Sequence, residues 1–232
     1  IGLPVAATER AGAMLLIGRA PGAPVFSAED RSLVETVASL AAVAVRSAEQ
    51  YAELRELNAR LGEIALTDAL TGLANRRAFD AAAARVHSEA RRHRRPYGAL
   101  MIDVDRFKDY NDRYGHQAGD RALEQIARAI AGGIRQEDEV FRYGGEEVAL
   151  LLSGQREPGL VALAERLRAR VAALEIEHAG YGVVTVSVGG AVFDPERGDD
   201  AARPNEVIAA ADRALYQAKA AGRDRVEITA LG

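Results

Sequence analysis

The chain has 232 residues, enough for one ordinary domain and a smaller element. Its 48% hydrophobic and 28% charged residues are typical of a soluble globular protein. The net charge of −4 excludes a global basic field that would recruit nucleic acid or anionic lipid, so a phosphorylated ligand must be held by local cations. The absence of cysteine excludes disulfides and thiolate chemistry, and we expect a cytoplasmic location.

Residues 1–25 predict strand, turn and strand, because the apolar run 12–18 is bounded by glycines. Two strands cannot bury a core by themselves. The chain begins at Ile1 rather than at methionine, so we expect this segment to be the end of a domain in a longer protein. We expect no membrane segment, since no uncharged apolar run approaches the ~20 residues that a spanning helix requires.

A single long helix is predicted over about 28–67, with Ser27 as its N-cap and acidic residues in its first turn. Its apolar positions follow alternating steps of four and three, and we call this set the seam. The seam comprises Leu33, Val37, Leu40, Ala44, Tyr51 and Leu54, with Ser47 in the one polar position. A second frame, Leu54, Leu57, Leu61 and Ile64, collides with the first. The pattern favours a parallel two-stranded coiled coil; the alternative is an imperfect helix lying on its own domain.

After Asp68, strands alternate with helices of 12–20 residues, a pattern typical of an α/β fold with a central sheet. We expect helices over about 76–94, 118–131, 157–173 and 205–221, and strands over 97–104, 139–143, 147–152, 183–193 and 225–229. The short link 143–147 predicts an antiparallel hairpin.

Two acidic features carry the chemistry. Asp103 ends a nearly all-apolar strand, where an unpaired carboxylate would be costly. Glu146 and Glu147 follow a Gly-Gly turn, which taken alone is as often a solvated hairpin tip as a site. If the two strands are neighbours, Asp103 and Glu146 converge at one edge of the sheet. Hard carboxylates and a backbone carbonyl suit Mg²⁺, which can neutralise charge on a transferring phosphoryl group.

Five segments of the chain resemble the GGDEF-type diguanylate cyclase family. They are Asp68-x-Leu70-Thr71-Gly72-Leu73-x-Asn75-Arg76, Asp103-x-Asp105-x-Phe107-Lys108-x-x-Asn111-Asp112, Gly115-His116-x-x-Gly119-Asp120, Arg142-Tyr143-Gly144-Gly145-Glu146-Glu147 and Ala211-Asp212-x-Ala214-Leu215-Tyr216-x-Ala218-Lys219. The resemblance implies a polymerase-palm-like, nucleotide-cyclase-like central sheet flanked by helices over 68–232. The segment from Phe26 to about Tyr51 resembles the last helix of GAF sensor domains, implying a sensor remnant over 1–50 and a signalling coiled coil over 28–67.

The resemblance implies that Asp103, Glu146 and the Val104 carbonyl bind Mg²⁺ or Mn²⁺, with Glu146 drawing the proton from the GTP 3′-hydroxyl. Glu147 would assist this step electrostatically or at the second metal position. For Asp105 we expect a helix-capping role at the turn instead. The departure from the family is Val148, where phenylalanine is usual, and we expect altered packing and turnover rather than a different reaction.

The substrate contacts implied by the resemblance are Asn111 and Asp120 for guanine and Phe107, Lys108, Gly144, Gly145, Lys219 and Arg223 around the phosphates. A carboxylate and an amide match the donors and acceptors of guanine; the alternative for Asp120 is a helix cap. Lys219 and Arg223 are four residues apart, which predicts one helical face near a C-terminus. Arg135, Asp138 and Arg166 resemble the family's product-binding inhibitory site, although Arg-x-x-Asp is usually a weak surface ion pair.

These features predict an enzyme that condenses two GTP molecules into cyclic di-GMP and two pyrophosphates as a parallel homodimer, inhibited by its product. Two alternatives remain. One is a domain that binds GTP or cyclic di-GMP without turnover, and the other is a related enzyme that makes a different cyclic dinucleotide. Asn111 and Asp120 favour guanine over the latter.

Overall fold

The computed structural model describes residues 2–7, 12–18, 22, 24–64, 66–197 and 202–231. The chain forms two compact units, Ile1–Ala65 and Leu66–Gly232, here called the N-terminal and C-terminal units. In the described residues, no helix has the length and apolar character needed to cross a membrane.

The N-terminal unit consists of an antiparallel hairpin and a helix. Strands β1 (Gly2–Ala7) and β2 (Gly12–Leu16) pair, and helix α1 (Ala28–Ile64) follows. The Ser27 hydroxyl accepts from the Asp30 N–H at 3.1 Å while the Asp30 carboxylate accepts from the Ser27 N–H, so the predicted cap is confirmed. The helix ends at Ile64 rather than at residue 67, where Thr67 instead forms a bridge with Ala74.

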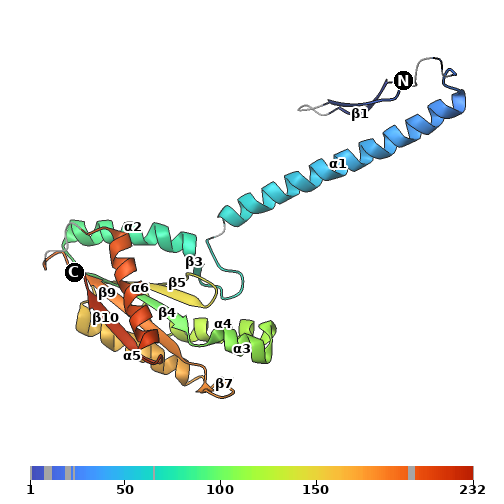
Figure 1. The fold of residues 1–232 in the computed structure, drawn as a ribbon. Helices are drawn as coiled ribbons and strands as arrows, with labels where there is room; N and C mark the ends of the chain where they lie inside the picture. The colour runs from blue at the N-terminus through green and yellow to red at the C-terminus, as the bar shows by residue number, and fades with distance from the viewer. Residues whose placement is uncertain are drawn as a thin grey trace. The chain divides into compact units, whose positions relative to one another are not determined.

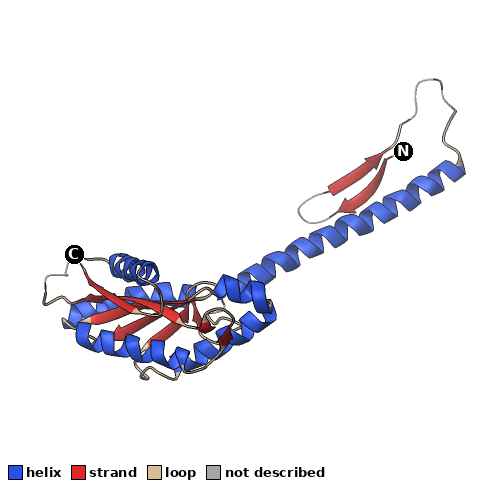
Figure 2. Ribbon diagram, turned by 60° about the horizontal axis from the view of Figure 1, so that its bottom comes forward, coloured by secondary structure: helices blue, strands red, loops and turns tan. Residues whose placement is uncertain are grey.

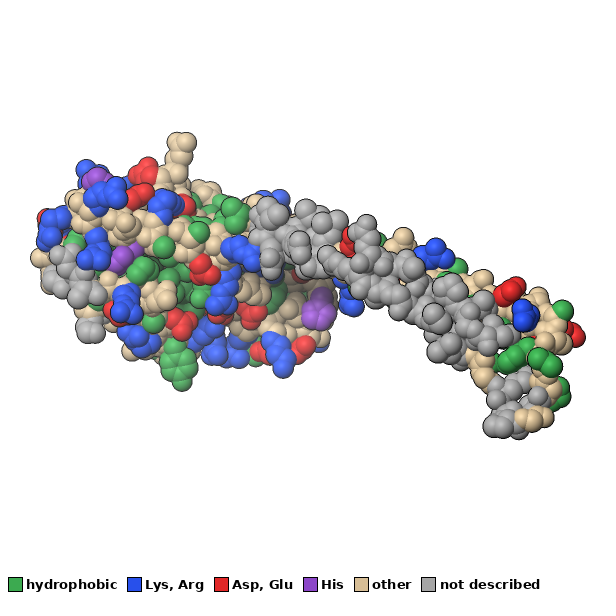
Figure 3. Space-filling view, turned by 90° about the horizontal axis from the view of Figure 1, so that it is seen from above, with side chains coloured by type: hydrophobic (Ala, Val, Ile, Leu, Met, Phe, Trp, Pro, Cys, Tyr) green, Lys and Arg blue, Asp and Glu red, His purple; other side chains and the backbone are tan. Residues whose placement is uncertain are grey.

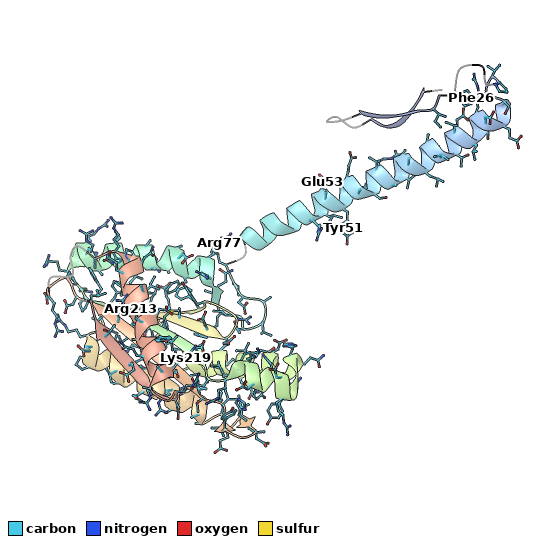
Figure 4. The ribbon with its side chains drawn as sticks, in the orientation of Figure 1. Phe26, Tyr51, Glu53, Arg77, Arg213 and Lys219 are labelled. Carbon is cyan, nitrogen blue, oxygen red and sulfur yellow. The ribbon has the colours of Figure 1, made fainter. Side chains whose placement is uncertain are left out.

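Helix α1 has two different apolar faces. Strand β1 packs against α1, and Val34 and Ala38 are buried. The seam lies open to solvent: Leu40 is 67% exposed and Tyr51, which projects from the helix in Figure 4, is 70% exposed. The side chains of the second frame, Leu57, Leu61 and Ile64, lie outside the described residues. Within the described part of the N-terminal unit, the seam therefore has no covering element of its own.

The C-terminal unit is built on a central sheet, drawn in red in Figure 2. The sheet has six strands in the order β10-β9-β4-β6-β5-β3. Its strands are β3 (Ala74–Asn75), β4 (Tyr97–Val104), β5 (Glu139–Arg142), β6 (Glu147–Ser153), β9 (Val186–Phe193) and β10 (Val226–Ala230). The central pairs β9–β4, β4–β6 and β6–β5 are antiparallel, whereas the outer pairs β10–β9 and β5–β3 are parallel. The predicted 143–147 hairpin and the adjacency of 97–104 to 147–152 are confirmed.

Helices cover both faces of this sheet, as Figure 1 shows. The helices are α2 (Arg76–His93), α3 (Phe107–Tyr114), α4 (His116–Ala131), α5 (Glu157–Ala172) and α6 (Pro204–Ala220). Along β4, Tyr97, Ala99 and Met101 join the core under α2 and α6, while the alternate residues join the core under α3, α4 and α5. All eight β4 residues are buried, which explains the continuous apolar run in the sequence.

The region before β9 differs from the prediction. The strand expected over 183–193 begins at Val186, and a small hairpin of β7 (Glu177–His178) and β8 (Gly182–Val183) precedes it. Gly180 and Gly182 both have positive φ, so the chain turns here instead of extending the sheet. The segment 107–114 forms helix α3, which contacts α4.

Helix α6 lies directly on the backbone of β9. A Cβ atom added to Gly189 would come within 2.0 Å of the Leu215 nitrogen and 2.3 Å of the Ala211 carbonyl. Only glycine permits this approach. The close packing brings the C-terminal end of α6, with Lys219, down to the sheet edge at which β4 ends, visible in Figure 4.

Candidate active site at the end of the central strand

The acidic residues predicted to converge do so at the C-terminal end of β4. Asp103 lies opposite Glu147 in the antiparallel register of β4 and β6. The Val104 N–H donates to the Glu146 carbonyl at 3.4 Å, closing the strand pair at the turn. The side chain of Glu147 folds against Gly144, since a Cβ there would come within 2.4 Å of its carboxylate. Two strands distant in the sequence thus place three carboxylates at one edge.

Asp103 is held by a lysine from α6. The Lys219 ammonium lies 2.7 Å from the Asp103 carboxylate, whose side chain is only 10% exposed. Burial raises the pKa of Asp103 to about 6, the Lys219 charge opposes this rise, and the charges of Glu146 and Glu147 add to it. The carboxylates repel one another in a partly dry environment, so this edge favours a cation.

The donor set fits a hard divalent cation. Asp103, Glu146 and the Val104 carbonyl would supply oxygen ligands, which are the type that Mg²⁺ prefers. Among the described residues no group of three or more His, Asp or Glu side chains is arranged to hold a metal ion by itself. In this structure the Lys219 ammonium is the positive group paired with one Asp103 oxygen.

Arg142 organises the turn and was given no role from the sequence. Its guanidinium donates to both oxygens of Asp68 at 2.9 and 3.0 Å and to the Gly145 carbonyl at 2.8 Å. Burial alone would raise the pKa of Asp68, but bonds from Thr71 and Arg142 outweigh it and lower that pKa. The arginine thereby joins the loop that opens the unit to the Gly-Gly turn. Its position inside a recognised motif was the signal available in the sequence.

The predicted guanine readers lie on α3 and α4, where Asn111 packs against Gly119, the residue before Asp120. A Cβ on Gly119 would fall 1.9 Å from the Asn111 side-chain oxygen, so glycine makes room for this amide. That oxygen is buried and lacks a hydrogen bond. Asp120 is exposed in the interior of α4, which begins at His116 with Gly115 before it, so the capping alternative for Asp120 is wrong. Among the described residues, none forms a hydrogen bond or ion pair with the Asp120 carboxylate.

The residues predicted to contact the phosphates lie in different kinds of position. Phe107 is buried in the core, so only its backbone N–H in the first turn of α3 can face a ligand. Lys108 is exposed one residue further. Helix α6 ends at Ala220, and Arg223 lies beyond it in a left-handed conformation with φ of 64°. The prediction that Lys219 and Arg223 share a helical face is therefore wrong, although both flank the same edge.

Asp105 is structural, but not as a cap. The residue before α3 is Arg106, which makes no side-chain capping bond. The Asp105 carboxylate instead accepts from the hydroxyls of Thr185 and Ser187 and from the Asp224 N–H. The capping expectation is wrong because the side chain turns toward β9 rather than along α3.

The residues resembling an inhibitory site form a compact turn. The Arg135 N–H donates to the Asp138 carboxylate at 3.1 Å, and the Arg166 guanidinium donates to the Gly133 carbonyl at 3.0 Å. Arg135 pairs with Glu137 at 3.8 Å rather than with Asp138. Burial raises the pKa of Asp138, and one of its oxygens is buried without a hydrogen bond. The simple surface ion pair is thus not what this motif forms.

Charge on the C-terminal unit is mixed. In Figure 3, Lys and Arg side chains are interspersed with Asp and Glu over the face seen. Val148 lies in the core beneath the turn, opposite Ile102. The effect of this valine on turnover stays a prediction.

An α/β sheet with paired antiparallel central strands, acidic residues at their joined ends and helices on both faces defines a palm-like nucleotidyltransferase domain. The family model described as diguanylate cyclase, GGDEF domain, matches residues 65–225. The chain belongs to this family of diguanylate cyclases.

Relatives and solved structures agree with this assignment. Diguanylate cyclase A of Treponema denticola is 32% identical over 233 residues, covering 98% of this chain and 58% of that protein. Diguanylate cyclase DgcP of Pseudomonas aeruginosa is 41% identical over 168 residues, covering 71% and 24% respectively. The chain thus spans less than two thirds of either relative. The coiled coil and GGDEF domain of Caulobacter crescentus DgcB, solved in complex with c-di-GMP, superposes with a TM-score of 0.65 at 30% identity, covering 81% of this chain and 99% of that one.

Proposed function

We propose that this chain catalyses the condensation of two GTP molecules into cyclic di-GMP with release of two pyrophosphates. The observation that carries the proposal is the convergence of Asp103, Glu146 and Lys219 at one sheet edge, within the segment matched to the family. Guanine would lie between α3 and α4, where Asn111 packs against Gly119, the residue before Asp120.

Mg²⁺ or Mn²⁺, when bound by Asp103, Glu146 and the Val104 carbonyl, would supply positive charge to the phosphate oxygens. The Glu146 carboxylate would accept the proton of the 3′-hydroxyl. That oxygen bonds to the α-phosphorus of the second GTP, the bond to the bridging oxygen breaks, and pyrophosphate leaves. Lys219, Lys108 and Arg223 would hold the phosphates. The same step, repeated at the second 3′-hydroxyl, closes the product ring.

Each active site would hold only one GTP, so the reaction requires two copies of the chain. We propose that the seam of α1 forms a parallel coiled coil that brings the two copies together. The exposure of Leu33, Leu40 and Leu54 supports this assignment, as does the coiled coil present in the DgcB structure. The N-terminal segment 1–50 would be the end of a GAF-like sensor, 28–67 the signalling helix and 68–232 the catalytic domain.

Regulation by product would act at Arg135, Asp138 and Arg166. Two guanidinium groups suit phosphate and guanine contacts, and one buried Asp138 oxygen has no hydrogen bond within the protein. Because GTP is a cytoplasmic nucleotide, we place the protein in the cytoplasm.

The test is incubation of the dimeric protein with GTP and Mg²⁺, followed by chromatography of the products. Cyclic di-GMP and pyrophosphate are expected in a 1:2 ratio. GTP binding without product would instead favour a binding module, and a cyclic product containing adenine from mixed nucleotides would favour the other enzyme class.

A further inference from the structure

Asp105 is a buried carboxylate that the proposed chemistry does not use. It lies two residues after Asp103, in the turn between β4 and α3, and is 5% exposed. A buried carboxylate is costly unless it is paired or fully hydrogen-bonded. Its partners therefore indicate what it does.

Both oxygens of Asp105 are engaged by protein donors. One accepts from the Ser187 hydroxyl at 2.6 Å, and the other accepts from the Thr185 hydroxyl at 2.7 Å and the Asp224 N–H at 3.0 Å. The Asp105 N–H also donates to the Thr185 carbonyl at 2.9 Å. With three of roughly four acceptor positions filled, this carboxylate is poorly suited to bind a second metal ion.

The partner in the sequence-distant loop, Asp224, follows Arg223 in a strained stretch of backbone. Gly222, Arg223 and Asp224 have φ of 119°, 64° and 46°. This conformation is unfavourable for the two non-glycine residues, so other contacts must hold the loop. The Arg223 N–H donates to the Ala218 carbonyl at 3.1 Å.

Two contacts hold Asp224, one through its backbone and one through its side chain. Its backbone N–H donates to Asp105, and its carboxylate accepts from Arg168 on α5 at 2.6 Å. The Asp105 contact is mostly buried, whereas the side chain of Asp224 is about half exposed at 45%. The buried charged acceptor is thus the stronger constraint on the loop.

We propose that Asp105 is a positioning residue for Arg223. By fixing the Asp224 N–H, it holds the left-handed backbone from which the Arg223 side chain extends, and it sets the affinity for the nucleotide's phosphates through that arginine. The same carboxylate ties this loop to the turn that carries Val104 and Lys108. The inference rests on the proposed function, because it assigns Arg223 to the phosphates of GTP.

The test uses 3′-deoxy-GTP, which lacks the attacking hydroxyl and therefore reports binding without turnover. Its dissociation constant and that of GMP are measured on the full chain, for the unaltered protein, Asp105→Asn, Arg223→Ala and the double variant. Asparagine keeps the size of the side chain but replaces one accepting oxygen by a donor.

Asp105→Asn is expected to weaken the binding of 3′-deoxy-GTP about tenfold and the binding of GMP less than about twofold. Arg223→Ala should give a similar pattern. If Asp105 acts through Arg223, the dissociation constant of 3′-deoxy-GTP for the double variant should exceed that of Arg223→Ala by no more than about twofold. The inference is overturned if the affinity losses of the two single variants multiply in the double variant. It is also overturned if Asp105→Asn weakens GMP binding as much as 3′-deoxy-GTP binding. Failure of the unaltered protein to bind 3′-deoxy-GTP would instead count against the proposed function itself.

Three additional measurements separate positioning from general structural damage. Arg168→Gln loosens Asp224 from its other side without touching the turn, so it should weaken 3′-deoxy-GTP selectively even if Asp105→Asn folds poorly. Asp194→Asn changes a comparably buried carboxylate at the far end of β9, paired with Arg156, and should lower stability without altering nucleotide affinity. Mn²⁺ affinity should survive in Asp105→Asn; its loss to the level of Asp103→Asn would overturn the inference.

Discussion

The sheet edge at Asp103 and the seam of α1 differ in how complete they are within one copy of the chain. At the edge, Asp103 pairs with Lys219, Arg142 bridges Asp68 and Gly145, and the neighbouring carboxylates lie in strand register. Along the seam, Leu40 and Leu54 face solvent and nothing in the N-terminal unit covers them in the residues described. The side chains at the edge are held by contacts within the chain, whereas the seam is an exposed apolar surface that would gain stability from a partner under the proposed function.

This contrast predicts that mutations in the two regions have different effects on activity and association. Damage at the edge should remove chemistry while leaving the fold and the association intact. Damage along the seam should remove association and lower activity in a manner that more protein restores. The following predictions test that division.

The largest effect is expected at the proposed proton acceptor. Glu146→Gln keeps size and burial but removes basicity and a charged metal ligand, so product formation should fall by about 10²–10⁴-fold. Initial rates of cyclic di-GMP formation, together with circular dichroism, check this. Glu124→Gln, a surface acid on α4, is the matched control. A Glu146→Gln protein with near-normal turnover would remove Glu146 from the chemistry.

The second effect concerns the seam. Leu40→Asp with Leu54→Asp places four charges into a two-stranded interface, and the dimer should dissociate with about 10–100-fold lower activity at low protein concentration. Sedimentation and rates over a protein concentration series measure this. Ser39→Asp adds a charge to an exposed position off the seam and should change neither. Unaltered association of the double variant would assign the seam a different role.

A smaller effect is expected at the Arg135 turn. Arg135→Ala removes one guanidinium from the proposed product site, so the inhibition constant of cyclic di-GMP should rise about tenfold while the initial rate stays the same. Progress curves with added cyclic di-GMP provide the measurement. Arg128→Ala, on exposed α4 surface, is the control. Equal inhibition of both variants would contradict the assignment.

The smallest effect concerns the Asp68–Arg142 bridge. Asp68→Asn should cost about 1–3 kcal/mol of unfolding free energy at neutral pH, since it removes charged hydrogen bonds. Because the pKa of Asp68 is lowered in the folded protein, this contribution is present above its unfolded value of 3.8 and is lost as pH falls through the folded value. Denaturant unfolding of both proteins from pH 7 to 3 should show the difference shrinking below about pH 4. A pH-independent difference would mean that the bridge does not stabilise through charge.

Much of the fold follows from local pattern. The run 97–104 is almost entirely apolar up to Asp103 because the strand is buried on both faces, and the short link at Gly144-Gly145 pairs β5 with β6, with Gly144 leaving room for the Glu147 carboxylate. Ser27 caps α1 as expected from its spacing to Asp30. The small hairpin at 177–183 was missed because its strands have two residues each and no periodicity to detect.

The roles of individual acids were harder to assign. Asp105 and Asp120 each stand near a helix start, and local spacing offers a cap for both. Asp105 instead accepts bonds from residues about 80 and 119 positions away, and Asp120 lies inside α4 beyond its first residues. No local rule predicts which distant donors a buried carboxylate will meet.

The sequence by itself determined the order of strands and helices, the acidic turn, the heptad steps of the seam and the family motifs, because these depend on residues close together in the chain. Only the tertiary structure decided that Lys219 meets Asp103, that Arg142 joins two loops and that Asp105 holds the loop of Arg223. Those contacts depend on Gly189 admitting α6 to the sheet and on strand register, which are set by packing between distant segments.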